Sequence, residues 1–517
     1  MARDSRVAQD TGATQSAAAA AAPLWLGTPA DVAHRDRWLF TTDSVEQVLL
    51  RSPLMLPLAG GSRQPGVRAR AVGPVVDVAW NSDIPFSMND GAIWAGRGVT
   101  TALMGGAWIE TGPVFLLLAP QFIYTQNEEF SDNRLSTSPG GSPFRPPWYA
   151  APPSADVPTR FGYDSFWRVD PGQSALGLRF GNFAGGASTA NLWWGPGERN
   201  AIVMSNHAPG FPHLFIRPID ALQTGIGPLR FDWILGTLTE SLYFDTQLEN
   251  DDRSLSGLAV TLAPEFAPGL TTGVARVVYA ALVGSDNVFS RGLDALIDGW
   301  GEDETDEQIL SLFGSWRTPG RPFEVYGELA WLDPPSSLEE LVARPDRTEG
   351  YTIGMRYAPT LDAADGRLRV HVELTNLEQT PDQPTSRFPS FYVSPWAVQG
   401  YTHRGQVIGA ATGPGSNSQF LALDFLREDW LAGVFGGRIR WENDVLHAMQ
   451  GGPQNHDVSV YGGVRGAGQA GGYTLGLELA IMDRYDFLFQ NESINFDADF
   501  AVDKHNIFVK LQVVPAN

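Results

Sequence analysis

Long stretches of the chain alternate between apolar and polar side chains at every second residue. The clearest stretch is residues 367–374, whose apolar members are Leu368, Val370, Val372 and Leu374. The positions between them carry Arg367, Arg369, His371 and Glu373. A period of two is the spacing of an extended strand, in which successive side chains point to opposite faces. The alternation returns in residues 323–331, 351–357, 473–481 and 507–513, so the chain is predicted to be all-β and antiparallel.

Three features of these segments favour a membrane barrel over a soluble sandwich. Their polar faces carry charges and glycine, their length of about 10 residues suits a tilted membrane strand, and aromatic side chains gather at their ends. These aromatic residues are Trp331, Tyr351, Tyr357, Trp430, Trp441, Tyr473 and Tyr485. Outer-membrane barrels have apolar faces toward lipid, polar faces toward the lumen and aromatic girdles at both interfaces. At roughly 25 residues per strand and turn, residues 70–517 allow about 16 to 18 strands.

The connections between these segments fit the same architecture. Some are tight, as at residues 363–366, and others are long and rich in proline, glycine or acidic residues, as at residues 131–157 and 285–312. Short periplasmic turns that alternate with long external loops are typical of outer-membrane barrels. No helix is predicted to cross the membrane, because the longest apolar run, residues 114–119, is far below the roughly 18 residues needed.

The N-terminal region differs from the rest. Residues 1–22 are rich in Ala, Ser, Thr and Gln and lack the apolar core of a signal peptide. We interpret them as a disordered lead-in from which an export signal has been removed, the alternative being the native start of a cytosolic protein. Residues 23–69 are predicted to form a short helical, plug-like segment. Asp43 and Glu46 have capping spacing, which predicts a helix over residues 45–50 that Pro53 stops. The barrel is expected to occupy residues 70–517.

Composition excludes several classes of function. The net charge is −22, and the only lysines are Lys504 and Lys510, so no basic stripe is available to neutralise nucleic-acid phosphates. There is no cysteine, which excludes disulfides, thiolate metal sites and cysteine nucleophiles. The eight histidines show no metal-binding spacing, and no cofactor is expected. The acidic residues 302–307 lack the spacing of a calcium loop and are interpreted as the start of a solvated helix.

Three strings of residues stand out from the strand pattern. The first reads Asn-Leu-Trp-Trp-Gly-Pro-Gly at residues 191–197 and continues to Ser-Asn-His-Ala-Pro at residues 205–209. Two adjacent tryptophans in an extended segment point to opposite faces, and the Gly-Pro-Gly after them forces a turn. The second string is residues 81–98, with Asn-Asp-Gly and then Trp-Ala-Gly-Arg-Gly. The third is residues 401–409, which begin with Tyr-Thr-His-Arg-Gly, followed by residues 412–416, which contain Gly-Pro-Gly.

Taken in their order along the chain, residues 81–98, then 191–209, then 401–416, these strings resemble those of the Wzi family of capsule-assembly proteins. A fourth segment, residues 323–328, is also similar, and the resemblance covers roughly residues 75–515. It implies an eighteen-stranded outer-membrane barrel with a small helical plug at its periplasmic side. The family's role, binding exported capsular polysaccharide like a lectin, implies a glycan partner and no enzymatic activity. The chain departs from the family in its short helical segment and in its C-terminus, which lacks a terminal aromatic residue; Phe508 is the nearest.

The first hypothesis is therefore a glycan-binding barrel in a bacterial outer membrane. The candidate ligand-binding residues are Trp193, Trp194, Asn206, His207, Arg97, His403 and Arg404. Aromatic faces stack on the apolar faces of sugars, while Asn, His and Arg hydrogen-bond hydroxyls or pair with uronate carboxylates. The alternative for each residue is structural support, because strings that identify a family can also hold a barrel shut. The oligomeric state is left open.

Two other functions are kept as alternatives. A lumen lined by Arg and Glu could make a passive pore for small solutes. A surface polysaccharide hydrolase would need two carboxylates that converge across strands. Glu324 and Glu328 lie on one face of one predicted strand, about 13 Å apart along it, which exceeds the separation such hydrolases use.

Overall fold

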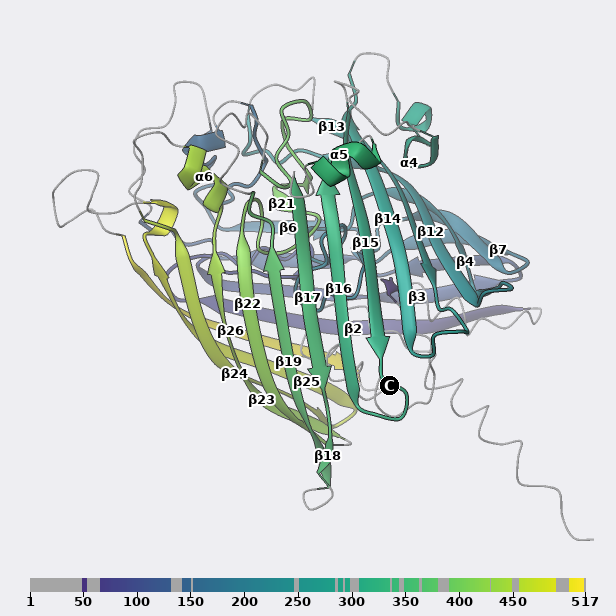
Figure 1. Cartoon of the computed structure of the whole chain (residues 1–517). Coiled ribbons are helices and arrows are strands. Elements are labelled where there is room, and N and C mark those ends of the chain that lie inside the picture. The colour runs from purple at the N-terminus through teal and green to yellow at the C-terminus, as the bar shows by residue number, and fades with distance from the viewer. Residues whose placement is uncertain are drawn as a thin grey trace, which may run out of the picture.

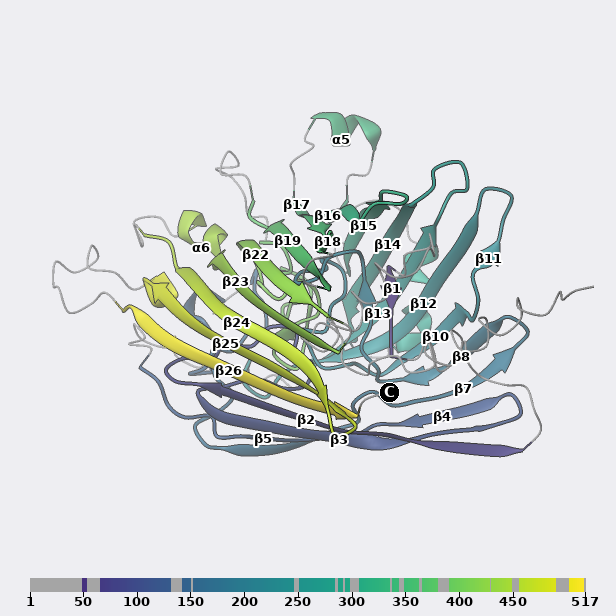
Figure 2. The same cartoon turned by 90° about the horizontal axis from the view of Figure 1, so that it is seen from below.

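The strands close into an antiparallel barrel of 18 strands around a filled lumen (Figures 1 and 2). The computed structural model describes residues 49–53, 66–131, 142–149, 152–245, 251–283, 287–291, 293–297, 306–334, 337–343, 348–361, 365–379, 390–427, 429–448, 455–489 and 502–515. Closure comes from β2 (Val67–Asn81), which pairs with β3 (Gly98–Thr111) on one side and with β26 (Lys504–Pro515) on the other. A closed barrel leaves no unpaired edge in the membrane.

The remaining barrel segments follow in chain order. They are β4 (Val114–Leu118), β5 (Gln121–Thr125), β6 (Phe166–Asp170), β7 (Ala175–Phe180), β8 (Phe183–Ser188), β10 (His213–Pro218), β11 (Leu222–Gln223), β12 (Pro228–Thr239), β13 (Asp252–Leu262), β14 (Leu270–Ala281), β15 (Asp306–Arg317), β16 (Phe323–Leu332), β17 (Glu349–Tyr357), β18 (Thr360–Leu361), β19 (Gly366–Asn376), β22 (Asn417–Leu426), β23 (Trp430–Arg440), β24 (Val458–Ala470) and β25 (Tyr473–Tyr485). Some strands are interrupted, so that β4 and β5 both pair with β3, and β6 and β7 continue one another beside them.

The helical elements are short and lie between strands. They are η1 (Pro147–Tyr149), η2 (Val288–Arg291), α4 (Asp294–Ile297), α5 (Leu338–Ala343), α6 (Asn443–Ala448) and η4 (Phe487–Phe489). Within the described ranges, no helix has the length and apolar character to cross a membrane.

The predicted alternation is confirmed in the barrel wall. In β25, Leu475, Leu477 and Leu479 are about 40–47% exposed on the outer face, while the alternate residues Gly476, Glu478 and Ala480 are buried toward the lumen. In β19, Arg369, His371 and Glu373 are likewise buried between outward apolar residues. An apolar outer face and a polar inner face are what a barrel in lipid requires.

The two ends of the barrel differ as predicted. At one end neighbouring strands join through tight turns, such as Gly471–Gly472 between β24 and β25. At the other end lie the long connections and the helices α4, α5 and α6, in the upper part of Figure 1. We call this second end the long-loop end.

Three connections from the long-loop end fold back into the lumen and form what we call the plug. They are loop A (residues 82–97, between β2 and β3), loop B (residues 189–212, between β8 and β10) and loop C (residues 390–416, between β19 and β22). Apolar residues of loops B and C, among them Ile202, Val203 and Tyr401, are fully buried in one cluster with the wall residues Phe215 and Tyr279. The three strings that stand out in the sequence are therefore the plug.

The predicted N-terminal helix differs from the structure. Leu49 is not helical, and Leu50 with Arg51 forms a short strand, β1, that pairs with Trp193–Trp194, named β9, inside the barrel. Leu50 is 3% exposed and packs in the plug core, so tertiary packing overrides the local capping signal. The rest of the predicted helix, residues 45–48, and residues 1–22 lie outside the described residues. The first barrel strand begins at Val67.

Two smaller predictions are also corrected. Asp306 and Glu307 are the first residues of β15 rather than a helix start, and residues 302–305 lie outside the described part of the chain. Trp441 does not belong to the outer aromatic girdle, because its indole Nε1 donates inward to Ser459, a fully buried residue of β24 (2.8 Å). Tyr357, Tyr473 and Tyr485 are exposed on the outer face as predicted, whereas Trp331 of the same predicted girdle is buried.

The lumen wall is cross-linked by buried ion pairs. Asp424 of β22 accepts hydrogen bonds from Arg369 of β19 (2.7 and 2.9 Å) and from Arg465 of β24 (2.8 Å). All three side chains are at most 3% exposed. Removing one member of such a cluster leaves an uncompensated charge in a dry interior.

We expect Asp424→Asn to lower the free energy of unfolding by about 3–5 kcal/mol. The matched control is Asp365→Asn, which breaks a surface ion pair between Asp365 and Arg427 (3.6 Å). Because the Asp365 carboxylate is almost fully exposed, this variant should change the free energy of unfolding by less than about 1 kcal/mol. Urea unfolding of the refolded barrel in detergent micelles measures both. Equal effects of the two variants would contradict the buried cluster.

Candidate functional site

The two adjacent tryptophans of β9 face opposite sides, as the sequence predicts. Trp194 packs in the apolar plug core and its Nε1 donates to Asp232 of β12 (3.3 Å). Trp193 lies beneath the guanidinium of Arg51 (4.5 Å to the ring centroid) and donates to the carbonyl of Gly197 (3.0 Å). Both side chains are fully buried. Their rings therefore hold the N-terminal strand and the turn of loop B in place.

The residue after the two tryptophans must be glycine, because the side chain of Glu328 lies close to its backbone. Gly195 has a φ of +114°, and a β-carbon there would lie 2.8 Å from a carboxylate oxygen of Glu328 in β16. Both the backbone conformation and the space exclude a larger residue. Glu328 in turn accepts hydrogen bonds from the Ile202 amide (3.0 Å) and from Ser311 (2.9 Å), which fixes loop B against the wall.

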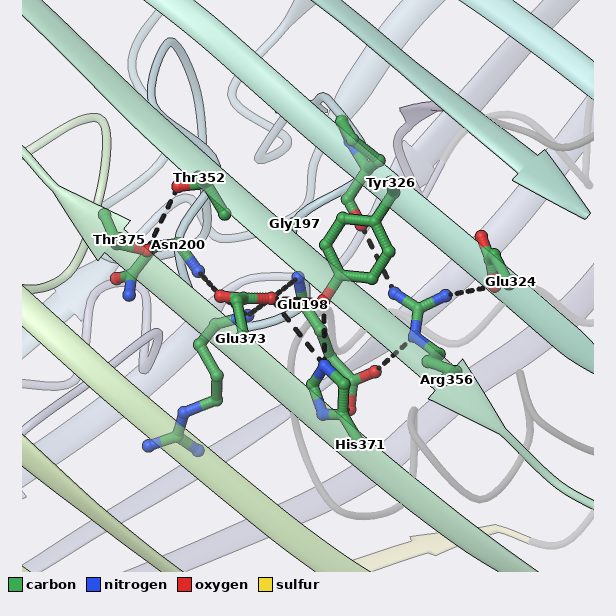
Figure 3. Close-up of polar contacts among 12 residues, drawn as sticks. Gly197, Glu198, Asn200, Glu324, Tyr326, Thr352, Arg356, His371, Glu373 and Thr375 are labelled. Carbon is green, nitrogen blue, oxygen red and sulfur yellow. Dashed lines mark hydrogen bonds and ion pairs between the residues drawn. The ribbon is translucent and has the colours of Figure 1, made fainter.

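A second wall carboxylate, that of Glu373, accepts hydrogen bonds from three consecutive backbone amides of loop B (Figure 3). Glu373 of β19 accepts the backbone N–H groups of Glu198 (2.7 Å), Arg199 (3.0 Å) and Asn200 (2.9 Å). It also accepts the hydroxyl of Tyr326 (2.7 Å) from β16. Successive amides that converge on one carboxylate form a strong, charge-assisted anion cradle.

Arg356 of β17 completes this anchor. Its guanidinium pairs with Glu324 (2.9 Å) of β16 and with Glu198 (3.1 Å) of loop B, and it donates to the carbonyl of Pro196 (3.3 Å) (Figure 3). Glu324 and Glu328, the carboxylates of the hydrolase alternative, are thus both engaged in holding wall and plug together.

The three plug loops also bind one another. The amide of Gly91 in loop A donates to the carbonyl of Asn206 in loop B (2.7 Å), and the Asn206 side chain donates back to the carbonyl of Asn89 (2.9 Å). From loop C, Gln406 donates to the carbonyl of His207 (2.9 Å). Two predicted site residues, Asn206 and His207, therefore lie at the junction of the three loops.

The other predicted site residues lie apart from this junction. His403 is fully buried and its Nδ1 accepts the amide of Thr239 (3.0 Å). Arg404 pairs with Asp170 (2.9 Å) and is about one third exposed. Arg97 donates to the carbonyl of Glu129 (2.5 Å) and is also about one third exposed.

A cavity of about 210 Å³ opens above the junction, at the long-loop end. Residues from all three plug loops line it, together with residues that follow β5, β23 and β25. The lining consists of Pro85, Phe86, Ser87, Trp94, Phe130, Pro146, Trp148, Val157, Pro158, Thr159, His207, Gly405, Gln406, Val407, Ala411, Thr412, Gly413, Pro414, Trp441, Glu442, Arg484, Phe487 and Leu488. We call it the outer cavity. Its mixture of ring faces and hydroxyl or amide groups suits a polar ligand with apolar faces.

Two side-chain oxygen atoms of this lining have no hydrogen-bond partner within the described part of the chain. They are Oε1 of Gln406 and Oγ1 of Thr412, whose side chains are 4% and 0% exposed. A buried polar atom without a partner costs free energy, which a ligand group or water can recover. Both atoms belong to the third string of the sequence, but the sequence alone did not single them out.

The charged groups at the outer cavity are compensated or neutral. Arg484 donates through two nitrogens to both oxygens of Asp457 (2.7 Å each). Burial lowers the pKa of His207 to about 4, although Asp90 opposes the shift. Burial raises the pKa of Glu442 to about 8, assisted by the Asp457 carboxylate and opposed by hydrogen bonding from Tyr149 and by Arg484. At neutral pH the imidazole is uncharged and the carboxyl is largely protonated.

Comparison with known proteins identifies the family. A family model described as Capsule assembly protein Wzi matches residues 86–426, which is more than half of the chain. The chain belongs to this Wzi family. No curated protein sequence matches it.

The solved structure of a Wzi protein agrees in fold. Wzi of Escherichia coli, an outer-membrane protein, aligns over 86% of this chain and 85% of its own, with a TM-score of 0.55 and 12% identity. A BenF-like porin from Pseudomonas fluorescens Pf-5 aligns over 86% of this chain and 98% of its own, with a TM-score of 0.38 and 11% identity. OccK9 of Pseudomonas aeruginosa aligns over the same shares with a TM-score of 0.41 and 12% identity. The family and the apolar outer face place this Wzi-family barrel in the bacterial outer membrane.

We expect Glu373→Ala to loosen the plug, because three amides of loop B lose their common acceptor. Planar-bilayer recording should show transient openings for this variant and a closed barrel for the unmodified protein. The matched control is Glu110→Ala, which removes a buried carboxylate that pairs with Arg68 and Arg179 of the wall (2.8 and 3.0 Å). Steady conductance of the unmodified protein would instead support the pore alternative.

Proposed function

We propose that the protein is a lectin of the outer membrane that binds capsular or other surface polysaccharide and helps to assemble or anchor it at the cell surface. The observation that carries the proposal is the outer cavity, in which aromatic side chains surround the unpartnered atoms of Gln406 and Thr412. Sugars present apolar ring faces to aromatic groups and hydroxyls to such polar atoms.

The position of the outer cavity supports this role. It lies at the long-loop end, which in outer-membrane barrels faces the cell exterior, where exported polysaccharide would be met. The Escherichia coli relative is described as a carbohydrate-binding β-barrel involved in group 1 capsule assembly. For the present chain, the shared family and the cavity chemistry are the grounds for the same class of ligand.

The proposed contact residues differ from those favoured by the sequence. His207 lines the outer cavity and stays in the proposed site. Trp193, Trp194 and His403 are fully buried and do not line the outer cavity, so we assign them to support of the plug. Asn206 supports the junction from below. Arg97 and Arg404 are partly exposed and remain candidates for contacts with a longer chain of sugars outside the cavity.

The proposal does not include catalysis. Glu324 and Glu328 each accept hydrogen bonds from a wall serine and also bind Arg356 or the Ile202 amide. Carboxylates engaged in this way, beneath a packed plug, are poorly placed to flank a glycosidic bond. We therefore infer a binding protein rather than a hydrolase.

We expect Thr412→Val to weaken binding of the cognate polysaccharide roughly tenfold, because it removes one hydrogen bond of about 1–1.5 kcal/mol without changing the shape of the side chain. Gln406→Leu should weaken binding at least as much, because it also removes the hydrogen bond from Gln406 to the His207 carbonyl. The matched control is Thr271→Val, at a buried lumen residue of β14 whose hydroxyl also lacks a partner among the described residues but does not line the outer cavity. Isothermal titration with purified polysaccharide measures all three. Full affinity of Thr412→Val and Gln406→Leu would exclude this cavity as the site.

A further inference from the structure

We propose that the outer cavity is selective for an uncharged sugar unit and rejects uronic acids and other anionic sugars. This inference rests on the proposed lectin function and specifies the chemical class of its ligand. It follows from how the few charged groups around the outer cavity are paired.

The volume of the outer cavity limits the size of the ligand, and its aromatic lining provides surface for the ligand to cover. The volume of about 210 Å³ equals roughly seven water molecules, which suits a single sugar ring with its substituents. Trp441 is held by a hydrogen bond from its Nε1 to Ser459 (2.8 Å) and by the Arg484 guanidinium over its ring (4.7 Å). Trp148 is braced edge-to-face by Phe489 (5.4 Å between centroids). These rings offer fixed apolar surface, which an uncharged sugar can cover.

Recognition of an anionic sugar normally requires an available cation. Among the described residues, the arginine that lines the outer cavity is Arg484, and two of its nitrogens already donate to both oxygens of Asp457. Its ring contacts with Trp441 and Phe487, both 4.7 Å, fix it further. A sugar carboxylate that approached Arg484 would therefore also approach the negative charge of Asp457, and the two would repel each other.

The two remaining titratable groups of the lining add no positive charge. His207 faces Asp90, yet burial holds its pKa at about 4, so it is neutral above that pH. Glu442, which faces Tyr149, Asp457 and Arg484, has a pKa of about 8 and ionises to a negative charge as the pH rises further. Hydroxyl and amide groups can hydrogen-bond the neutral imidazole, Gln406 and Thr412 across this range.

The net negative charge of the whole chain also disfavours the binding of anionic sugars. The net charge is −22, and a field of one sign opposes the approach of a polyanion over about one Debye length, near 8 Å at physiological ionic strength. Selection against anionic sugars therefore operates both at long range and inside the outer cavity.

The test is a titration of the purified barrel in detergent with two sets of oligosaccharides of equal length, one neutral and one containing uronic acid. We expect binding of neutral members and at least roughly tenfold weaker binding of the uronate members. Tighter binding of the uronate members would overturn the inference and leave the lectin function standing. Failure of both sets, and of whole polysaccharide, would instead overturn the lectin function itself.

A gain-of-function variant tests the cause of the selectivity. Asp457→Asn removes the charge that compensates Arg484 while keeping an acceptor oxygen for the Leu488 amide (2.9 Å). Affinity for uronate oligosaccharides should rise roughly tenfold, and Asp483→Asn, an exposed carboxylate paired with His505 (2.6 Å), is the control that should leave it unchanged. Unaltered uronate affinity of a folded Asp457→Asn protein would contradict the assigned role of this pair.

The pH profile of the unmodified protein is an independent measurement that needs no variant. Between about pH 5 and about pH 7, His207 is neutral and Glu442 is protonated, so affinity for a neutral oligosaccharide should stay constant within about twofold. Binding that strengthens steadily as the pH falls through this range would show recognition by a protonated group and would overturn the inference.

Discussion

The filled lumen depends on the hydrogen bonds that Glu373 accepts from the backbone of loop B. Three consecutive amides of loop B donate to this one carboxylate of the barrel wall. The hydroxyl of Tyr326 also donates to the carboxylate and holds it in place. Once loop B is held in the lumen, its apolar residues meet those of loop C, and Asn206 reaches loop A. The plug is therefore not a separate domain, because hydrogen bonds to a side chain of the barrel wall hold it in place.

This arrangement explains why Trp193 and Gly195, two residues of the first string, do not line the outer cavity although other residues of the three strings do. Trp193 and Gly195 fit β1, Arg51 and Glu328 so closely that their freedom to change is small. The outer cavity sits on top of that framework and is lined by side chains such as Thr412 and Trp441.

The sequence predicts the barrel well because strand faces follow from a local period of two, as in residues 367–374. It predicts the site less well because the outer cavity joins residues from 85 to 488, and no local pattern reports that convergence. Trp441 shows the difficulty: it ends a strand like a girdle residue, but it turns inward to Ser459. The capping signal before Leu50 fails for a similar reason, since pairing with Trp194 decides its conformation.

The proposed carbohydrate site lies on the outer surface of the plug. The most direct test is an experimental structure of the protein bound to a defined oligosaccharide of its cognate polysaccharide. We expect a sugar ring in the outer cavity, against Trp441 or Trp148, with hydroxyls within hydrogen-bond distance of Gln406 Oε1 and Thr412 Oγ1. An oligosaccharide bound elsewhere on the barrel, with the outer cavity holding only water, would contradict this proposal.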